Sequence, residues 1–427
     1  MTIDAATART APYPHTLSIP IAASLVVLLA GLFAVSQVRD AQTLLEMSGV
    51  HLVEPIGYLL MAPISDLLDA LTLLSARQHV AGLLGVLVLW AVWRLTRPRR
   101  VRYAWRAILA SFATLLVLVV AAYASLALLP RPMAYLATVD PDMLRIDFHS
   151  HTSNSKDARQ GFSLEKNRIW HRDGGYDVAF ITDHKALAGS SRRDGVILLS
   201  GIEADWKGEH VGLLGAQRAI GDLLTADLRS IDARRFIAGS LPLAREPILI
   251  WNHPRADELD KLPIADRAAE VGVRAIEISN GAPHGMDLVR RKRQQIVELA
   301  GKHNLALVSG SDNHGWGFAA PNWTLLHLRN WRDLNDVELA AGIEGAIGEG
   351  GLGATRVVER ASVDPGVSSA ALALTIVTVP WGVLTTLSED ERLMWIGWIW
   401  AIASVRLLLR GPRPSVRTGT IAIPLPD

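Results

Sequence analysis

The segment from Asp147 to Asp157, DFHSHTSNSKD, places two acids, two histidines and several hydroxyl side chains within eleven residues. His149 and His151 are two residues apart, so in an extended backbone both side chains point to the same side, as two ligands of one metal ion must. The chain has no cysteine, which excludes disulfides, iron–sulfur clusters and thiolate zinc sites. Any metal ion must therefore be held by imidazole and carboxylate groups.

More acids and histidines lie at the ends of other short apolar runs. They are Asp183 and His184 after VAFIT, Glu203 after VILLSGI, His210 before VGLLGA, His253 after PILIWN, and Asp312 and His314 after LALVSGS. Strand ends share one edge of a barrel, so we expect these seven side chains to converge. A single histidine of this kind is more often an ordinary core or surface residue, but seven agreeing positions predict a metal centre. We interpret His171, His303 and His327 as ordinary helix or surface residues and leave His284 undecided.

The elements that must position these residues belong to an α/β fold. From about residue 141 to 362, short apolar runs alternate with polar helical stretches and Gly, Asp and Asn turns. Seven strand-like runs, with helix-like stretches such as 285–304 between them, predict a β/α barrel. A doubly wound open sheet is the alternative architecture.

The remainder of the chain is strongly apolar, and 50% of all residues are hydrophobic at a net charge of +1. The runs 17–38, 79–95 and 105–129 predict transmembrane helices, and 368–387 with 393–409 predict a hairpin of two more spans. The run 52–75 carries Glu54, Asp66, Asp69 and two prolines, so an amphipathic or interfacial helix competes there with a span. We expect an N-terminal membrane region over 1–140, a barrel over 141–362, and a C-terminal membrane hairpin and tail over 363–427.

Two arginine clusters bear on the orientation of an integral membrane protein. Six arginines between Trp93 and Arg106 favour the cytoplasm for that segment, which places the barrel outside, as in a bacterial inner-membrane protein with an extracytoplasmic domain. Arg406, Arg410, Arg413 and Arg417 in the tail favour a cytoplasmic barrel through the predicted final hairpin. We give the denser, earlier cluster more weight.

The motifs DFHSHT, ITDH, GIEA, NHP, EISN and GSDNH, in this order, resemble the PHP (polymerase and histidinol phosphatase) domain family. The resemblance covers about half of the chain and implies a distorted (β/α)7 TIM-like barrel, here inserted between N-terminal and C-terminal transmembrane helices. It implies one metal ion on His149, His151, Glu203 and Asp312, a second on Glu203, His210 and His253, and a third on Asp157, His184 and His314. Many members have Ser-Asp-Gly around the first acid of the third set, whereas this chain has Ser-Lys-Asp-Ala, so the glycine is missing.

Mixed imidazole and carboxylate ligands suit two or three divalent ions of zinc, manganese or iron. Neighbouring cations bridged by a carboxylate activate a water and clamp the oxygens of a phosphoryl group, which predicts hydrolysis of a phosphate ester without a protein nucleophile. Asp183 is expected to orient a ligand or the attacking water. Arg255, Lys156 and Lys185 are candidates to receive the substrate phosphate.

The leading hypothesis is a membrane-anchored phosphoesterase that meets membrane lipid and a phosphate-ester substrate. The alternative is a membrane-tethered metal-binding sensor or ligand-binding module without turnover. Nucleic acid is not an expected partner, because the net charge is near zero and a long basic groove signature is lacking. A transporter is disfavoured, because the predicted spans carry few ionisable residues in their centres.

Overall fold

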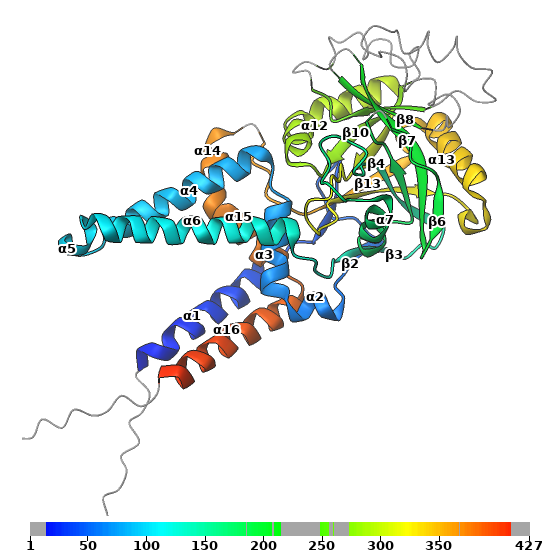
Figure 1. Ribbon diagram of the computed structural model, residues 1–427. Coiled ribbons are helices and arrows are strands. Elements are labelled where there is room, and N and C mark those ends of the chain that lie inside the picture. The colour runs from blue at the N-terminus through cyan, green and yellow to red at the C-terminus, as the bar shows by residue number, and fades with distance from the viewer. Residues whose placement is uncertain are drawn as a thin grey trace, which may run out of the picture.

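The computed structural model describes residues 14–184, 186–206, 209–214, 248–255, 259, 273–366 and 368–410. The described residues form one curled, mixed sheet of eleven strands and a separate pair of strands. Figure 1 shows the sheet and its covering helices at one end of the molecule, with the apolar helices projecting from it. The strand order is β1-β13-β12-β4-β5-β7-β8-β9-β10-β11, with β6 on the outer side of β7.

All seven predicted strands form. They are β4 (Met143–Ser150), β5 (Val178–Ile181), β7 (Val196–Trp206), β8 (Glu209–Leu214), β9 (Ile248–Asn252), β10 (Val273–Asn280) and β11 (Ala306–Gly310). The other strands were not predicted: β1 (Val38–Asp40), β2 (Val50–Val53), β3 (Tyr135–Thr138), β6 (Ser191–Arg193), β12 (Asn322–His327) and β13 (Thr355–Arg360). The N-terminal region therefore contributes β1 to the main sheet, where it pairs with β13.

The sheet is not the uniformly parallel one that a regular (β/α)7 barrel requires. β4, β5 and β7 are parallel, as are β9, β10 and β11, but β8 is antiparallel to both of its neighbours. Only two residues separate β7 from β8, which is too short for the crossover that joins parallel strands. The sheet nevertheless curls back on itself, since Asp312 N donates to His149 O at 2.7 Å and His151 N donates to Asn313 O at 3.1 Å.

Three helices of this part have clear local causes. α7 (Leu164–Asp173) begins where the Ser163 hydroxyl accepts from Lys166 N, and α13 (Asp336–Gly350) begins at an Asn335–Glu338 capping box. α12 (Pro283–His303) starts with proline and ends at Asn304, whose left-handed φ of 52° terminates it, close to the predicted 285–304. Buried side chains fill the interior on both faces of the sheet, and the rings of Phe148 and Phe180 stack with centroids 5.4 Å apart.

The apolar part contains further helices. They are α1 (Pro14–Ala30), η1 (Gly31–Phe33), α2 (Ile56–Leu60), α3 (Ala62–Thr72), α4 (Ala76–Leu95), α5 (Arg99–Arg102), α6 (Trp105–Leu128), α14 (Ser369–Ala373), α15 (Thr375–Thr386) and α16 (Glu389–Arg410). Among the described residues, three helices are long and apolar enough to cross a membrane by length and composition: α4, α6 and Glu389–Leu409 of α16.

The remaining predicted spans are shorter than expected. The first apolar helix covers Leu17–Phe33, and the chain then turns into β1 instead of continuing to residue 38. The run 368–387 is split at Leu374, and α15 has 12 residues, a rise of about 18 Å against a hydrocarbon core of about 30 Å. The run 52–75 folds into β2, α2 and α3, so it is not a single span.

The short α15 changes the expected course of the tail. α16 starts at the sheet end of the apolar part, where Gln37 Nε2 donates to Glu391 Oε2 at 3.0 Å, and it runs away from the sheet (Figure 1). The arginines in its last turns and those around α5 therefore lie at the ends of helices that point away from the sheet. The predicted C-terminal hairpin of two spans would place the tail on the same side of a membrane as the metal-binding residues. α15, with 12 residues, is too short to be one of these two spans.

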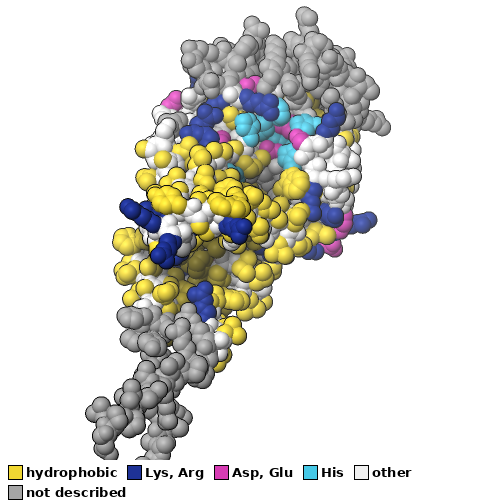
Figure 2. Space-filling model, turned by 60° about the vertical axis from the view of Figure 1, so that its left-hand side comes forward, with side chains coloured by type: hydrophobic (Ala, Val, Ile, Leu, Met, Phe, Trp, Pro, Cys, Tyr) yellow, Lys and Arg dark blue, Asp and Glu magenta, His cyan; other side chains and the backbone are white. Residues whose placement is uncertain are grey.

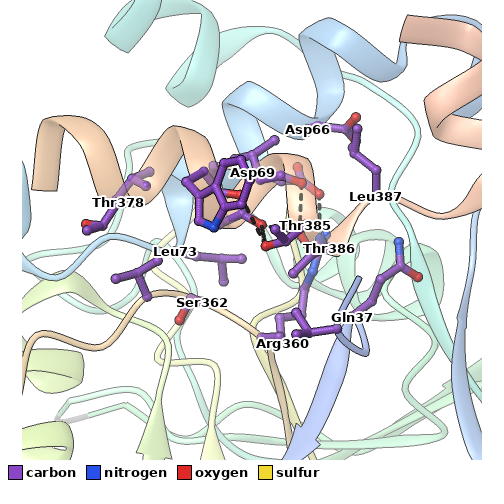
Figure 3. Close-up of a pocket in the computed structure, with 18 of the residues that line it drawn as sticks. Gln37, Asp66, Asp69, Leu73, Arg360, Ser362, Thr378, Thr385, Thr386 and Leu387 are labelled. Carbon is purple, nitrogen blue, oxygen red and sulfur yellow. Dashed lines mark hydrogen bonds and ion pairs between the residues drawn. The ribbon is translucent and has the colours of Figure 1, made fainter. Parts of the chain in front are cut away.

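A polar junction joins the sheet to the apolar helices. Asp69 of α3 accepts from Arg131 Nη2 at 2.7 Å and from Arg360 at the end of β13. Tyr58 donates to both Asp66 and Asp69, at 3.0 and 3.1 Å. A cavity of about 300 Å³ opens beside this cluster, and Figure 3 shows it between α3, α15 and the end of β13. Because Asp69 pairs with arginines from beyond α6 and from β13, the cluster links α3 to the sheet.

Candidate metal centre

The predicted ligands gather at one end of the sheet. His149 is the penultimate residue of β4, and His151 directly follows the strand. Their Nε2 atoms are 3.0 Å apart, so the two side chains share one side, as their spacing predicted. Both imidazoles are fully buried. Figure 2 shows histidine side chains collected on the face from which the apolar helices project, with basic side chains around them.

Glu203 lies at the centre of the cluster. Its two oxygens face different histidines, and its side chain is almost completely buried. Oε2 lies 3.0 Å from His149 Nε2, 3.3 Å from His151 Nε2 and 3.3 Å from His184 Nε2. Oε1 lies 2.8 Å from His210 Nδ1 and 3.5 Å from His253 Nε2. One carboxylate with separate partners on each oxygen is the arrangement that bridges two cations.

Asp312 supplies the second buried carboxylate. Its Oδ1 lies 3.5 Å from His149 Nε2, 3.4 Å from His151 Nε2 and 3.4 Å from His314 Nδ1. Its Oδ2 accepts from Asn280 Nδ2 at 3.2 Å and lies 4.0 Å from His253 Nε2. Asp312 therefore faces the same histidine pair as Glu203.

Asp157 completes a third, more open corner. Its Oδ2 lies 3.6 Å from His184 Nε2 and 3.4 Å from His314 Nε2. The side chain of Asp157 is 56% exposed, whereas the carboxylates of Glu203 and Asp312 are buried. The loss of the expected glycine after this acid therefore does not keep Asp157 away from its two histidines.

The donor set fits divalent ions. Four overlapping groups each have nitrogen and oxygen donor atoms within 4.8 Å of one another: His149–His151–Glu203, His149–His253–Asp312, His151–Asp312–His314 and His184–Glu203–His210. His253 Nδ1 is buried and has no hydrogen-bond partner among the described residues. Imidazole and carboxylate in this mixture suit zinc, manganese or iron, and the donors are too close together to be stable without a shared cation or proton.

The charges inside the cluster are strongly coupled. Burial alone lowers the pKa of His151, but hydrogen bonds to Asp312 and Glu203 outweigh it and raise that pKa to about 9. Burial also lowers the pKa of His149. The negative charges of Glu203 and Asp312 outweigh this effect and raise that pKa well above its usual value. For Glu203, burial raises the pKa while the neighbouring His149 lowers it, and the outcome lies well below the usual range. The buried carboxylates therefore favour the protonated forms of His149 and His151.

Asp183 positions a ligand from behind. It is fully buried and accepts from Thr152 N at 2.6 Å and from Ser155 Oγ at 3.0 Å. Ser155 Oγ lies 3.1 Å from His151 Nδ1 and accepts from His184 N at 2.9 Å. Of the two predicted roles for Asp183, these contacts favour the orientation of ligands through Ser155.

The predicted phosphate-binding cations lie outside the cluster. Arg255 is two residues beyond His253, its side chain is exposed, and its backbone N donates to Glu209 Oε2 at 2.7 Å. Lys156 is also exposed, beside Asp157. Lys185 lies outside the described residues. The basic run Arg290–Gln295 of α12 is partly buried, and Arg290 donates to Ser362 Oγ at 2.7 Å while Arg293 contacts Glu359 at 3.1 Å.

Two buried carboxylates escaped the sequence analysis. Glu277 of β10 lies 3.3 Å from His149 Nδ1 and accepts from His253 N at 2.7 Å. Asp147 accepts from His171 Nε2 at 2.8 Å and from Ser311 N at 2.8 Å. His171 is therefore a buried residue that supports the metal centre through Asp147, and it does not lie on the surface. An acid inside an apolar strand run, as in AIEIS and LRIDF, is the sequence signal that marks both positions.

The remaining histidines lie apart from the cluster. His303 is in the last turn of α12, His327 is exposed at the end of β12, and His284 is exposed in the first turn of α12. A surface group of Asp140, Asp142 and His327 also brings donor atoms together, but it is exposed and accompanies no other feature of the site.

The backbone is strained where it carries the ligands. His253 and Asp312 have positive φ values of 21° and 47°, which side chains with a Cβ rarely adopt. Gly310 precedes Asp312 at the point where β11 passes the centre. A Cβ added there would collide with Glu277 Oε1 and with the His149 side chain. The site is thus built by close backbone approach as well as by ligand side chains.

Comparisons with known proteins give little beyond this geometry. No protein-family model matches the chain, and no curated protein matches it. Two solved structures are similar at low levels. PsfC from Pseudomonas syringae PB-5123 has a TM-score of 0.36 at 17% identity, covering 56% of this chain and 96% of that one. Endonuclease Q, in complex with a 27-mer duplex carrying an abasic lesion, has a TM-score of 0.33 at 14% identity, covering 48% of this chain and 56% of that one.

Proposed function

We propose that this chain is a metal-dependent phosphoesterase of the PHP type, anchored in a membrane by its apolar helices. The observation that carries the proposal is Glu203, whose Oε2 faces His149, His151 and His184 while its Oε1 faces His210 and His253. A carboxylate with separate partners on each oxygen can bridge two ions, and paired ions are typical of hydrolytic phosphate sites.

Short donor-to-donor contacts within each of the three ligand sets that the family resemblance implies support the proposal. His149, His151, Glu203 and Asp312 would hold one ion, Glu203, His210 and His253 a second, and Asp157, His184 and His314 a third. Divalent ions held there would polarise a phosphoryl group and activate a water. Asp183 would keep His151 in place through Ser155, and the exposed Arg255 and Lys156 would neutralise the incoming phosphate.

Membrane anchoring is supported by α4, α6 and α16, which have the length and composition to span hydrocarbon. The arginines around α5 and Arg406 of α16 both lie at helix ends that point away from the metal centre (Figure 1). Because basic loops favour the cytoplasm, this arrangement favours an extracytoplasmic metal centre. The tail and the loop then agree on one orientation.

The test is hydrolysis by the purified full chain. We expect turnover of phosphate esters with zinc, manganese or iron, and a loss of at least about a thousandfold in Glu203→Ala and Asp312→Ala, since each substitution removes a ligand of the reacting centre. Glu298→Ala, on the exposed face of α12, is the matched control and should keep full activity. Full activity in both ligand variants would refute the mechanism. A fully loaded chain that turns over no phosphate ester would leave the sensor module as the better account.

A further inference from the structure

We infer that the metal centre takes its phosphate ester from the membrane surface, as the head group of a lipid, and not from bulk water. This inference rests on the proposed function and names the substrate class of the same site. Its basis is that the apolar helices are attached to the metal-binding end of the sheet.

The start of α4 meets the centre through α12. The backbone N of Arg77 in the first turn of α4 donates to Asp287 Oδ2 at 2.9 Å. Asp287 lies in the first turns of α12, which begins three residues after Asn280, and Asn280 donates to the ligand Asp312 at 3.2 Å. One end of a spanning helix is therefore only a few residues from a metal ligand.

The end of α6 meets the centre through Arg159. The backbone N of Arg159 donates to His314 O at 2.8 Å, and its guanidinium donates to Ala127 O, in the last turn of α6, at 3.3 Å. Arg159 follows the ligand Asp157 by two residues. A second spanning helix is thus tied directly to the third, most open corner of the cluster.

α3 and the segment after α6 support the loop that follows Asp312. A Cβ added to Gly317 would lie 3.1 Å from Thr72 Cγ2, at the end of α3. The Arg131 guanidinium, just beyond α6, lies 5.9 Å from the ring centroid of Phe318. The loop that carries Asp312 and His314 therefore rests on the helices that lead into the apolar part.

The accessible edge of the cluster lies on this same side. Asp157, His184 and His314 lie on it, with side chains 56%, 27% and 18% exposed, and His210 is exposed to a similar extent as His314, at 16%. Trp316 follows His314 by two residues, is 53% exposed, and has the Arg159 guanidinium 5.7 Å from its ring centroid. Figure 2 shows the histidine side chains above the hydrophobic side chains of the apolar part.

This arrangement selects for a substrate at an interface. An exposed tryptophan next to a guanidinium is typical of the head-group region of a membrane, where the ring is half-immersed and the cation meets phosphates. A phosphate ester on a lipid would reach the exposed ligands while its chains remain in the bilayer. A water-soluble ester does not need an accessible edge, here called the mouth of the site, that faces the membrane. It would bind as well to a mouth on any other face of the protein.

A spin-label experiment that needs no catalysis measures whether the accessible edge of the cluster lies at the membrane. The chain has no cysteine, so Trp316→Cys and Val337→Cys each accept a single nitroxide label. Val337 is 79% exposed on α13 and serves as the control. In vesicles containing the full chain, the label at 316 should be more accessible to oxygen than to a water-soluble nickel chelate, and the label at 337 should show the reverse. Equal, water-like accessibility at both positions would overturn the inference.

Turnover tests the substrate class with matched head groups. Dioleoyl phosphatidic acid and dioleoyl phosphatidylglycerol in phosphatidylcholine vesicles are compared with glycerol 3-phosphate and glycerophosphoglycerol, with the Glu203→Ala activity subtracted. We expect kcat/KM for one lipid to exceed that for its soluble partner at least about tenfold, because the membrane concentrates and orients the ester at the mouth. Equal or faster turnover of the soluble partners would overturn the lipid inference and leave the phosphoesterase intact. No turnover of any of the four by the loaded chain would overturn the lipid inference, and the wider screen of phosphate esters then decides on the phosphoesterase.

Discussion

Glu277 Oε1 lies 3.3 Å from His149 Nδ1, on the side of the imidazole opposite to the nitrogen that faces Glu203 and Asp312. The other oxygen of Glu277 accepts from His253 N at 2.7 Å and from Asn280 Nδ2 at 3.0 Å. One buried carboxylate thus fixes the ring of one ligand and the backbone of another. Carboxylates in this position set the tautomer and raise the basicity of a metal-bound imidazole.

Glu277→Gln should therefore weaken metal binding about 10- to 100-fold while leaving the fold in place. Both carboxylate oxygens of Glu277 accept hydrogen bonds. A glutamine side chain has only one accepting oxygen, so at least one of these hydrogen bonds is lost in Glu277→Gln. Titration of the metal-free full chain with zinc or manganese, against a competing chelator, measures the effect. Glu298→Gln, on the exposed face of α12, is the control. An unchanged affinity in Glu277→Gln would show that His149 does not depend on this support.

The pH dependence of metal binding follows from the raised histidine pKa values. Metal ions bind neutral imidazole, whereas the pKa of His151 in the ion-free centre is raised to about 9 and that of His149 lies well above its usual value. Protons must therefore leave when an ion binds, so affinity should rise with pH until about 9. The sign is opposite for the ion-free fold, which gains stability from these protonated histidines below their ordinary pKa and loses it as pH rises through the folded value.

Calorimetry in two buffers of different ionisation enthalpy, between about pH 6 and pH 8, counts the released protons. We expect more than one proton per chain to be released at neutral pH. Binding without proton release would mean that the ion enters a different set of groups.

Gly310→Ala should damage the centre by steric overlap. The added Cβ would collide with Glu277 and with the His149 side chain, so β11 must move away from β4 and β10. We expect a loss of about 1–3 kcal/mol in the free energy of unfolding, and weaker metal binding. Thermal unfolding of the full chain in detergent, followed by circular dichroism, measures it.

Gly301 provides the matched control. A Cβ at this position in α12 meets nothing within 4 Å, so Gly301→Ala should stabilise by about 0.5–1 kcal/mol. If both substitutions raise the free energy of unfolding, β11 does not pass the metal centre as closely as described.

The membrane orientation is open to single-cysteine labelling, because the chain has no native cysteine. In intact cells, an impermeant maleimide should label Val337→Cys on α13, while Arg99→Cys in α5 should react only after permeabilisation. The reason is that the metal centre and the arginine-rich connection lie at opposite ends of α4 and α6 (Figure 1). The reverse pattern would place the metal centre in the cytoplasm.

The sequence predicted that these acids and histidines converge, because acids and histidines at strand ends are a local pattern. All nine proposed ligands, from His149 to His314, lie in one cluster, and all seven predicted strands form. His210 stands at the start of its strand, yet it joins the cluster because β8 reverses direction after β7, with His210 opposite Asp205 and diagonal to Glu203. The direction of a strand depends on the length of the connection before it. Only two residues join β7 to β8, and this connection is too short for a parallel crossover.

Long-range features were not predictable in the same way. β12 and β13 have mixed polar and apolar residues, and their place depends on pairing with β4 and with β1, far away in the sequence. The apolar run 368–387 has the composition of a span, but Leu374 breaks it into two short helices. The role of Glu277 follows from its neighbour His149, which is 128 residues away.

The most direct test of the account is the metal content of the purified full chain, measured by elemental mass spectrometry beside its Glu203→Ala variant. The account predicts two or three divalent transition-metal ions per chain, and a loss of at least one when the carboxylate between the two histidine groups is removed. A folded chain that retains no ion after incubation with zinc, manganese and iron would contradict it.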